Sequence, residues 1–308
     1  MKIDDDAPQP RITVQPLDEI LGRKFDVLDA GFVRVVDYMG GDASIVQAAR
    51  VSYGAGTKQL QEDQNLIRYL LRQRHTTPFE MCEIKLHVRV PMDCWRQWIR
   101  HRTANVNEYS TRYSVAIDLA QQTTADSWRS QESDNRQGSG KLISVAEGER
   151  FSQGERELQA HARAVYEERI KSGVAREQAR KDLPLSTYTE AYWKTDLHNM
   201  LHFLRLRMDR HAQFEIRQYA NIIGNKIVAR WCPTAWQAFL DYQIETLSFS
   251  RHERRILVSL IRGDRDRATE LATDAGWLNA EGTAIKRNRE RVEFEAKLLE
   301  LGLTAPWL

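Results

Sequence analysis

The chain has 308 residues, of which 42% are hydrophobic and 29% charged, a balance typical of a globular protein with a buried core. Its 45 basic and 43 acidic residues leave a net charge of +2, which argues against bulk binding to nucleic acid. No run of about 18 apolar residues occurs, so we expect no transmembrane helix and no membrane partner. The acidic N-terminus (MKIDDDAPQP) does not resemble a secretory signal, so we expect a cytoplasmic protein.

The first half of the chain mixes strand and helix patterns after an irregular N-terminal segment, residues 1–30. In order, the patterns predict a strand, two helices, a strand, a helix and a strand at residues 31–38, 42–52, 61–74, 83–90, 92–101 and 109–117. Asp42 follows two glycines and is placed to cap the helix that begins there. Residues 83–90 alternate strictly between apolar and polar, which requires a strand with one buried face.

The second half is mainly helical after a polar stretch. Residues 120–156 are rich in glycine and serine and are predicted to form a long excursion. Helices are then predicted at residues 155–172, 175–180, 188–209 and 211–230, followed by a charged helical extension at 246–308. This order of elements predicts an α+β fold, with a central, mainly antiparallel sheet flanked by helices.

The most informative segment is RHRTANVNEYSTRY, which begins at Arg100. It gathers three arginines, a histidine, a glutamate, two asparagines and a serine within fourteen residues. Guanidinium groups grip phosphates and carbonyls in pairs, while amides and hydroxyls fix orientation. Favourable charge at a helix C-terminus would explain Arg100 and Arg102 but not the polar residues that follow. The segment therefore predicts a site for an anionic, hydrogen-bonding small molecule.

Two further segments are weaker when they are considered singly. The turn HTTPFE at 75–80 could simply end a helix, and ARKDLP at 179–184 could be an ordinary capped helix end. Neither GxGxxG nor GxxxxGK[ST] occurs, so a bound dinucleotide would have to be held by side chains rather than by a glycine-rich turn.

Metal and thiol chemistry have little support in the sequence. His198 and His202 stand one helical turn apart, a spacing that can chelate a metal but more often reflects ordinary packing. Cys82, Cys94 and Cys232 form no CxxC pair, so we expect free, buried thiols rather than a disulfide, a zinc ligand set or a nucleophile.

Taken together and in this order, the clusters resemble the flavin-dependent thymidylate synthases. That family's signature, RHR followed by seven residues and a serine, is present here as Arg100 to Arg102 and Ser110. The family's HxTPFE turn matches residues 75–80, and its RxxLP segment matches residues 180–184. Its LR…HAQ-aromatic-EIR pattern matches residues 206–217.

The resemblance implies reductive methylation of dUMP to dTMP. Methylenetetrahydrofolate would supply the carbon, NADPH would supply the hydride, and a non-covalent FAD would carry the redox chemistry. It also implies a homotetramer with active sites built at subunit junctions, a catalytic domain at residues 31–245, and no metal.

The resemblance also assigns roles to individual residues. FAD contacts are implied for Ser52, Thr77, Glu80, Arg100, His101, Arg102, Glu108, His202 and His211. Contacts with dUMP are implied for Gln97, Glu108, Ser110, Thr111, Arg112, Arg180, Leu206 and Arg207. Among the residues nearest the chemistry, Arg207 would face the uracil, His75 would lie by the flavin, and Ser110 would bind rather than attack. Asp196 and His198 stand where the family often has asparagine and arginine.

Two rival hypotheses remain open at this point. A nucleic-acid-binding module could use the arginines of residues 100–112 on phosphates and stack bases on Trp95, Trp98 and Tyr109. A metalloenzyme could use the paired histidines. Neither rival accounts for the HxTPFE and RxxLP segments.

Overall fold

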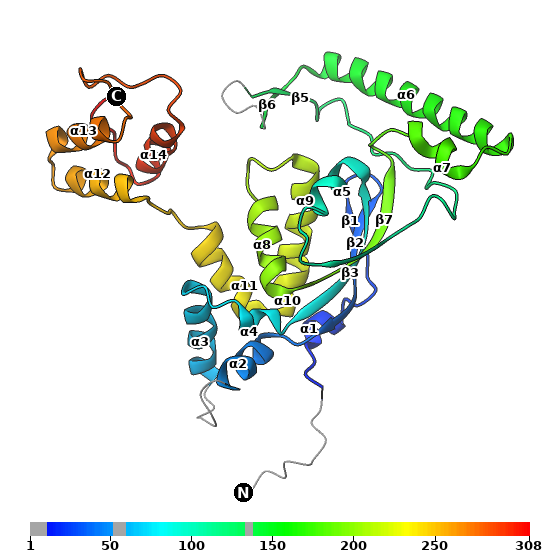
Figure 1. Cartoon of the computed structure of the whole chain (residues 1–308), viewed down its shortest axis with the longest axis horizontal. Helices are drawn as coiled ribbons and strands as arrows, with labels where there is room; N and C mark the ends of the chain where they lie inside the picture. The colour runs from blue at the N-terminus through cyan, green and yellow to red at the C-terminus, as the bar shows by residue number, and fades with distance from the viewer. Residues whose placement is uncertain (1–10, 52–59, 133–137) are drawn as a thin grey trace, which may run out of the picture. The chain divides into compact units, whose positions relative to one another are not determined.

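The computed structural model describes residues 11–51, 60–132 and 138–308 (Figure 1). These residues form two compact units, Met1–Ile244 and Glu245–Leu308, which are considered separately below. Among the residues described, no helix is both long enough and apolar enough to cross a membrane.

A five-stranded sheet organises the first unit, and every neighbouring pair of its strands is antiparallel. In spatial order its strands are β1 Phe25–Val27, β2 Gly31–Met39, β3 Glu83–Pro91, β7 Tyr188–Asp196 and β4 Asn105–Glu108. This confirms the predicted α+β class and the mainly antiparallel sheet. The strict alternation of β3 places Ile84, Leu86 and Val88 in the core, while their polar neighbours stay partly exposed.

Two predicted elements were wrong in this region. Residues 188–196 are a strand rather than the start of a long helix, because they pair with β3 along its whole length, from Pro91 to Glu83. Residues 109–117 do not form a strand. The ladder of β4 ends at Glu108, and Tyr109 makes one last backbone bond to Glu190 before the chain turns away.

Helices pack against this sheet and against one another. Those of the first unit are α1 Gln15–Asp18, α2 Asp42–Val51, α3 Leu60–Arg72, α4 Thr77–Glu80, α5 Met92–Trp98, α6 Val145–Lys171, α7 Arg176–Ala179, α8 Leu197–Arg207, α9 Phe214–Ile222, α10 Ala229–Trp231 and α11 Pro233–Phe239. A 3-10 turn at 180–182 follows α7, and π-helical turns at 223–228 and 240–244 follow α9 and α11. The sheet-facing helices α5, α8 and α9 matter most for the site, because they contact both the strands and each other.

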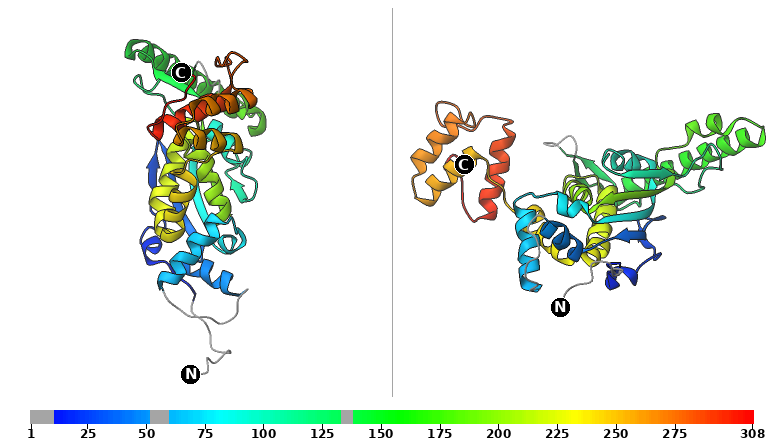
Figure 2. Two further views of the ribbon diagram at one scale, coloured as in Figure 1. Left: turned by 90° about the vertical axis from the view of Figure 1, so that its left-hand side faces the viewer. Right: turned by 60° about the horizontal axis from the view of Figure 1, so that its bottom comes forward.

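The predicted excursion at 120–156 contains more regular structure than expected. It includes a hairpin of β5 Arg129–Gln131 and β6 Ser139–Leu142, and α6 begins at Val145, ten residues before the predicted start. Ser144 caps α6 by accepting a hydrogen bond from the backbone nitrogen of Glu147. In Figure 2, α6 is a long helix at the periphery of this unit.

Asp42 does not cap its own helix as predicted. Its carboxylate accepts hydrogen bonds from the backbone nitrogens of Thr234 at 2.7 Å and Ala235 at 3.2 Å, so it caps α11 instead. Trp231 reinforces this closure by donating from Nε1 to the carbonyl of Gly40 at 2.8 Å. The start of α2 and the start of α11 are therefore joined across about 190 residues of sequence.

An aromatic cluster forms the centre of the core behind the sheet. Trp98 is fully buried, and its ring centroid lies 4.8 Å from Phe203, 5.4 Å from Trp193 and 5.8 Å from Tyr219. The three cysteines are buried and free, as predicted. The cluster ties α5, α8, α9 and β7 into one rigid support.

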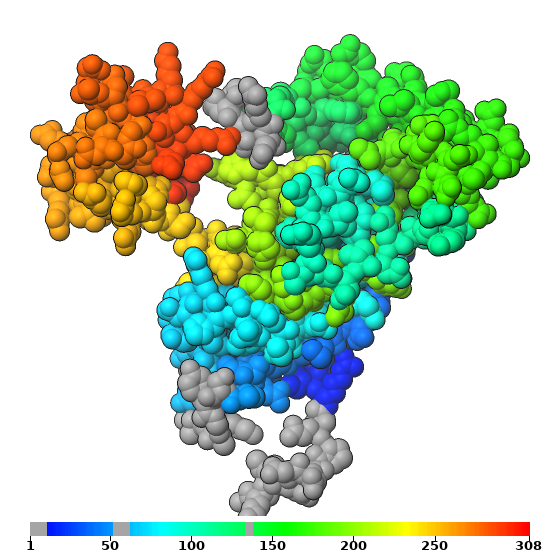
Figure 3. All heavy atoms as spheres, in the orientation of Figure 1, coloured from blue at the N-terminus to red at the C-terminus, as the bar shows by residue number. Residues whose placement is uncertain are grey.

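The second unit has its own core. Its helices are α12 Arg251–Ile261, α13 Arg265–Asp274 and α14 Arg289–Glu300. They enclose Trp277, whose ring centroid lies 5.4 Å from that of Phe294. A complete capping box, Ser250 with Glu253, begins α12. The atoms of this unit appear in orange and red in Figure 3.

Candidate functional site

A cavity of about 510 Å³ opens where the segment after α5 meets α8 and β7. Its lining is strongly cationic because it includes Arg100, Arg102 and Arg207, and His101 lies among them. The remaining lining residues are Thr103, Trp193, Thr195, His198, Asn199, His202 and Leu206. Two segments about one hundred residues apart in sequence therefore supply one site.

The end of α5 explains why the arginines face this cavity. Trp98 packs against Phe203 of α8, which draws the C-terminus of α5 toward that helix. The helix then stops, and the backbone nitrogen of His101 donates to the carbonyl of Trp98 in a tight turn. The hydroxyl of Thr195 donates to the carbonyl of Thr103 at 3.0 Å and so fastens the segment to β7.

Arg207 is held at two points on this turn. Its Nε donates to His101 Nε2 at 3.2 Å, and its Nη2 donates to the carbonyl of Gln97 at 3.3 Å. His101 can accept this bond because burial, together with the positive charges of Arg207 and His202, lowers its pKa to about 4. The imidazole is therefore neutral at neutral pH, and it orients Arg207 instead of competing with it as a second cation.

The cavity concentrates positive charge without a counterion from the described residues. The pKa of Arg207 is lowered by burial and by Arg100, and the pKa of His202 is lowered by burial and by nearby cations such as Arg205. Trp193 also lines this wall, and its buried Nε1 has no partner among the residues described. The guanidinium donors suit the phosphates and carbonyl groups of a bound dinucleotide.

A second cluster gathers around Arg180 and Arg112. Arg180 donates to the hydroxyl of Thr111, and Arg112 pairs with Glu177 at 3.0 Å. The hydroxyl of Ser110 accepts a bond from the backbone nitrogen of Arg112 at 3.4 Å. These residues form a cationic patch of their own and do not line the 510 Å³ cavity.

The remaining predicted site residues lie apart from both groups. Thr77 and Glu80 belong to the short α4, which packs against α8. His75 is exposed, and the centroid of its ring lies 6.0 Å from that of Tyr69. His211 pairs with Asp209 at 2.9 Å and lines a different cavity, of about 660 Å³, beside the β5–β6 hairpin. Ser52 lies outside the described residues.

Glu108 faces back toward the sheet. Its two carboxylate oxygens accept from Trp95 Nε1 at 3.0 Å and from the hydroxyl of Thr189 at 2.9 Å. Asp196 also has a local function, because it caps α8 by accepting from the backbone nitrogen of Asn199 at 2.8 Å. His198 lines the 510 Å³ cavity.

Sequence reasoning missed several wall residues of the cavity. Trp193 and Thr195 were hidden because their strand was predicted to be helical, although they stand two residues apart and so share one face of a strand. Thr103 belongs to the predicted RHR segment but was not singled out, and Asn199 carried no motif signal. The alternation of Tyr188–Asp196 was the one pattern that could have revealed the strand.

The structure weakens both rival hypotheses. Trp95 and Trp98 are 1% and 0% exposed, so neither can stack on a base. Within residues 11–51, 60–132 and 138–308, no group of three or more histidine, cysteine or carboxylate residues is arranged to hold a metal ion.

Comparison with known proteins identifies the family. The model of the Thy1 family, "Thymidylate synthase complementing protein", matches residues 34–234. A flavin-dependent thymidylate synthase from Wolbachia pipientis wMel is 49% identical over 254 residues, covering 82% of this chain and 89% of the relative. This chain belongs to the flavin-dependent thymidylate synthase family.

Other relatives agree with this assignment. The flavin-dependent thymidylate synthase of Ruegeria pomeroyi is 48% identical over 262 residues, covering 84% of this chain and 86% of that protein. A crystal structure of the UMP/dUMP methylase PolB from Streptomyces cacaoi, bound with 5-Br dUMP, matches with a TM-score of 0.65 and 28% identity. The match covers 71% of this chain and 98% of the methylase chain, so nearly the whole fold of the methylase is present here.

Proposed function

We propose that this protein methylates dUMP reductively to dTMP, with methylenetetrahydrofolate as carbon donor, NADPH as reductant and bound FAD as cofactor. The observation that carries the proposal is the cavity in which the RHR segment and Arg207 meet, in a chain that belongs to this family. We further propose that residues 31–245 carry the catalysis, that 246–308 form a helical extension, and that the enzyme works in the cytoplasm.

The residues of the cavity fit a flavin dinucleotide. Arg100 and Arg102 would bind its phosphates, while His101 and His202, whose ring centroids lie 5.6 Å apart, would contact it side by side. Bound FAD supplies the hydride chemistry between NADPH and the pyrimidine. The protein itself contributes position and electrostatics.

Arg207 is the residue best placed to assist the chemistry. Its Nε and Nη2 are occupied by His101 and Gln97, which leaves Nη1 to face a uracil carbonyl. A fixed cation there stabilises the negative charge that develops on the pyrimidine as hydride reaches C6. Neutral His101 keeps the guanidinium oriented before the substrate arrives.

The second cluster would hold the nucleotide phosphate. Arg112, Arg180 and the hydroxyls of Ser110 and Thr111 lie together and offer charged and neutral donors. This second cluster and the 510 Å³ cavity are separate groups of residues within one chain. We therefore propose a homotetramer in which the second cluster of one subunit completes the cavity of another. The same arrangement would bring His75, Thr77, Glu80 and His211 to shared sites.

The purified protein as isolated provides the test. It should be yellow, and its visible flavin absorption should bleach with NADPH in the absence of oxygen. Given dUMP labelled with tritium at C5, together with methylenetetrahydrofolate and NADPH, it should form dTMP and release the tritium. UMP in place of dUMP measures selectivity for the deoxyribose. A colourless protein that binds no added FAD, or a flavoprotein that forms no dTMP, would contradict the proposal.

Sharing of the site can be tested separately. Arg207→Ala and Arg112→Ala damage different groups of residues, so each homotetramer should be inactive. Co-expression of the two variants should restore part of the activity, because some sites would then combine two intact halves. No recovery in a mixed assembly confirmed by mass spectrometry would show that each site comes from a single chain.

A further inference from the structure

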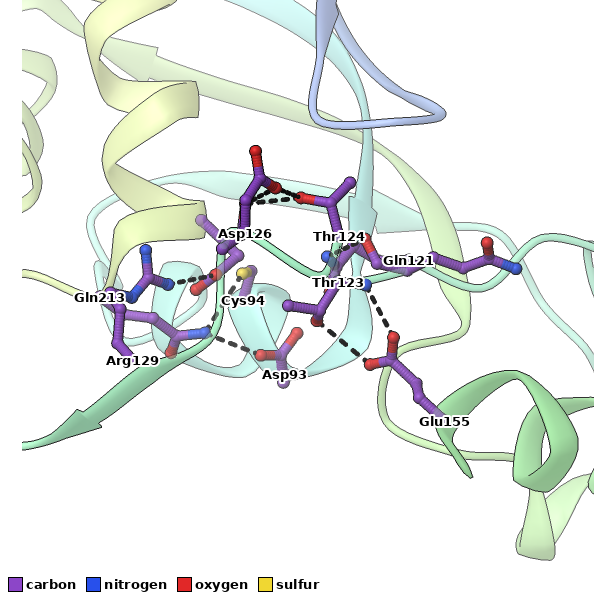
Figure 4. Close-up of polar contacts among 12 residues, drawn as sticks. Asp93, Cys94, Gln121, Thr123, Thr124, Asp126, Arg129, Glu155 and Gln213 are labelled. Carbon is purple, nitrogen blue, oxygen red and sulfur yellow. Dashed lines mark hydrogen bonds and ion pairs between the residues drawn. The ribbon is translucent and has the colours of Figure 1, made fainter. Parts of the chain in front are cut away.

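Three side chains form a hydrogen-bonded line between α5 and the start of α9, where Gln213 lines the 660 Å³ cavity. Gln213 Nε2 donates to Asp93 Oδ2 at 2.9 Å, and Gln97 Nε2 donates to Gln213 Oε1. Asp93 and Gln97 lie four residues apart, so they share one face of α5. Gln213 immediately precedes α9, and Figure 4 shows its amide directed at Asp93 and Cys94.

Gln213 occupies the N-cap position of α9 and makes no side-chain cap there. Its amide contacts Asp93 and Gln97 on α5 instead. These two contacts therefore join the start of α9 to one face of α5.

The line has only one possible direction. An ionised carboxylate can only accept hydrogen bonds, so Asp93 must receive the NH2 group of Gln213. The oxygen of Gln213 then faces Gln97, and Gln97 must donate in turn. Asp93 thereby determines which end of the Gln97 amide is oxygen and which is nitrogen, a choice that shape alone leaves open because the two ends are nearly equal in size.

The side chains around Asp93 do not compete for its hydrogen bond with Gln213. The adjacent carboxylate, Glu215, pairs with Arg129 at 3.0 Å, at side-chain exposures of 17% and 22%. Cys94 lies 4.0 Å from Gln213 Nε2, and its thiol stays protonated because burial raises its pKa, with Asp93 adding to the effect. Neither neighbour supplies a stronger donor that would draw Asp93 away from Gln213.

We propose that Asp93 and Gln213 are positioning residues that fix the orientation of the Gln97 amide toward the nucleotide. This inference rests on the proposed function, because Gln97 is one of the residues expected to contact dUMP. The backbone carbonyl of Gln97 accepts from Arg207 Nη2, which places this residue beside the site. Its side-chain amide, held by Gln213, would then offer its oxygen and its remaining N–H to the substrate in one fixed order.

Asp93→Asn is the decisive variant, because asparagine keeps the size of aspartate but can donate as well as accept. The line then loses its single direction, and a fraction of Gln97 amides reverses. With the FAD-loaded enzyme, we expect the Kd for dUMP to rise about twofold, because the apparent Kd is the intrinsic Kd divided by the fraction of correctly oriented amides, here about one half. The KM for dUMP should rise with it, while kcat at saturating dUMP is largely kept.

A double-mutant cycle separates positioning from general destabilisation. Gln97→Ala should raise the Kd for dUMP, and adding Asp93→Asn to it should cause no further rise, because no amide remains to orient. Equal losses in both backgrounds would overturn the inference. Gln213→Met, which keeps the length of the side chain without hydrogen bonds, should match Asp93→Asn and decides the question if that variant fails to fold.

Controls keep the two hypotheses distinguishable. Asp241→Asn removes a carboxylate of similar exposure, paired with Arg68 at 2.7 Å in another part of the unit, and should leave dUMP affinity unchanged. Wild-type enzyme that binds no dUMP would refute the proposed function itself. Wild-type enzyme that binds dUMP, with Asp93→Asn binding equally well, would refute only the positioning role.

Discussion

Glu177 restrains an arginine that we expect to bind the phosphate of dUMP. Its carboxylate lies 3.0 Å from a guanidinium nitrogen of Arg112, with side-chain exposures of 55% and 59%. Such an exposed ion pair stabilises a protein by about 0–1 kcal/mol. The phosphate of dUMP can bind Arg112 only after the ion pair with Glu177 is broken. The free energy of dUMP binding is therefore less favourable by the same amount. The Glu177→Gln variant should therefore bind dUMP more tightly, by up to about fivefold at 1.4 kcal/mol per decade of Kd.

Equilibrium titration of the FAD-loaded enzyme with dUMP, followed by calorimetry, measures this change. The gain should shrink at high salt, because ions screen exposed charges. Glu149→Gln is the matched control, since it removes the same charge from an exposed pair with Arg156 at 3.5 Å. Unchanged or weaker dUMP binding by Glu177→Gln at low salt would refute the phosphate role assigned to Arg112.

Three further predictions test the rest of the site and its support. Arg207→Ala should weaken dUMP binding roughly tenfold to a hundredfold, the scale of a lost charged hydrogen bond, while the flavin spectrum persists; retained dUMP affinity would exclude contact with the nucleotide. In FAD-free protein, the free energy of unfolding should fall between about pH 6.5 and 4, because unfolded His101 takes up a proton that the folded imidazole refuses until about pH 4. Urea titrations at pH 6.5 and pH 4 measure this fall in the free energy of unfolding. In His101→Gln the fall should be smaller by roughly 1 kcal/mol, a figure discounted for the partial exposure of the side chain. The same fall in the variant and the wild type would contradict the lowered pKa of His101. Gly31→Ala should destabilise the protein by about 1–3 kcal/mol, since the new methyl group would lie 1.9 Å from the Tyr219 hydroxyl, whereas Gly154→Ala, with open space around it, should not destabilise it; equal melting temperatures for the two variants would refute this.

Local patterns predicted those elements whose structure is decided locally. Residues 31–38 were recognisable as a strand because they contain three valines and a phenylalanine, and residues 83–90 because they alternate strictly between apolar and polar. Residues 188–196 were not, because the helical period of the following α8 extended the apparent helix backward. Pairing with β3 decides that strand, and such pairing is a long-range contact that no local window contains.

The candidate site shows the same division. The mixture of arginines and amides after Arg100 indicated an anionic ligand from composition alone. That Arg207 would contact His101 could be expected only through the family resemblance, because the two are separated by more than a hundred residues. Asp42 shows how local reasoning fails: aspartate at a helix start is normally its cap, but here the carboxylate serves α11.

The bonds from Asp42 and Gly40 to α11 also set an order of events during synthesis. The partners of these two residues lie about 190 positions later in the chain, at Trp231, Thr234 and Ala235. A ribosome must therefore translate nearly the whole first unit before α2 and the end of β2 can be secured, and closing so long a loop is entropically slow. The growing chain would complete α8, with Arg207, before this closure. The join between the start of α2 and α11 would form only after α11 leaves the ribosome.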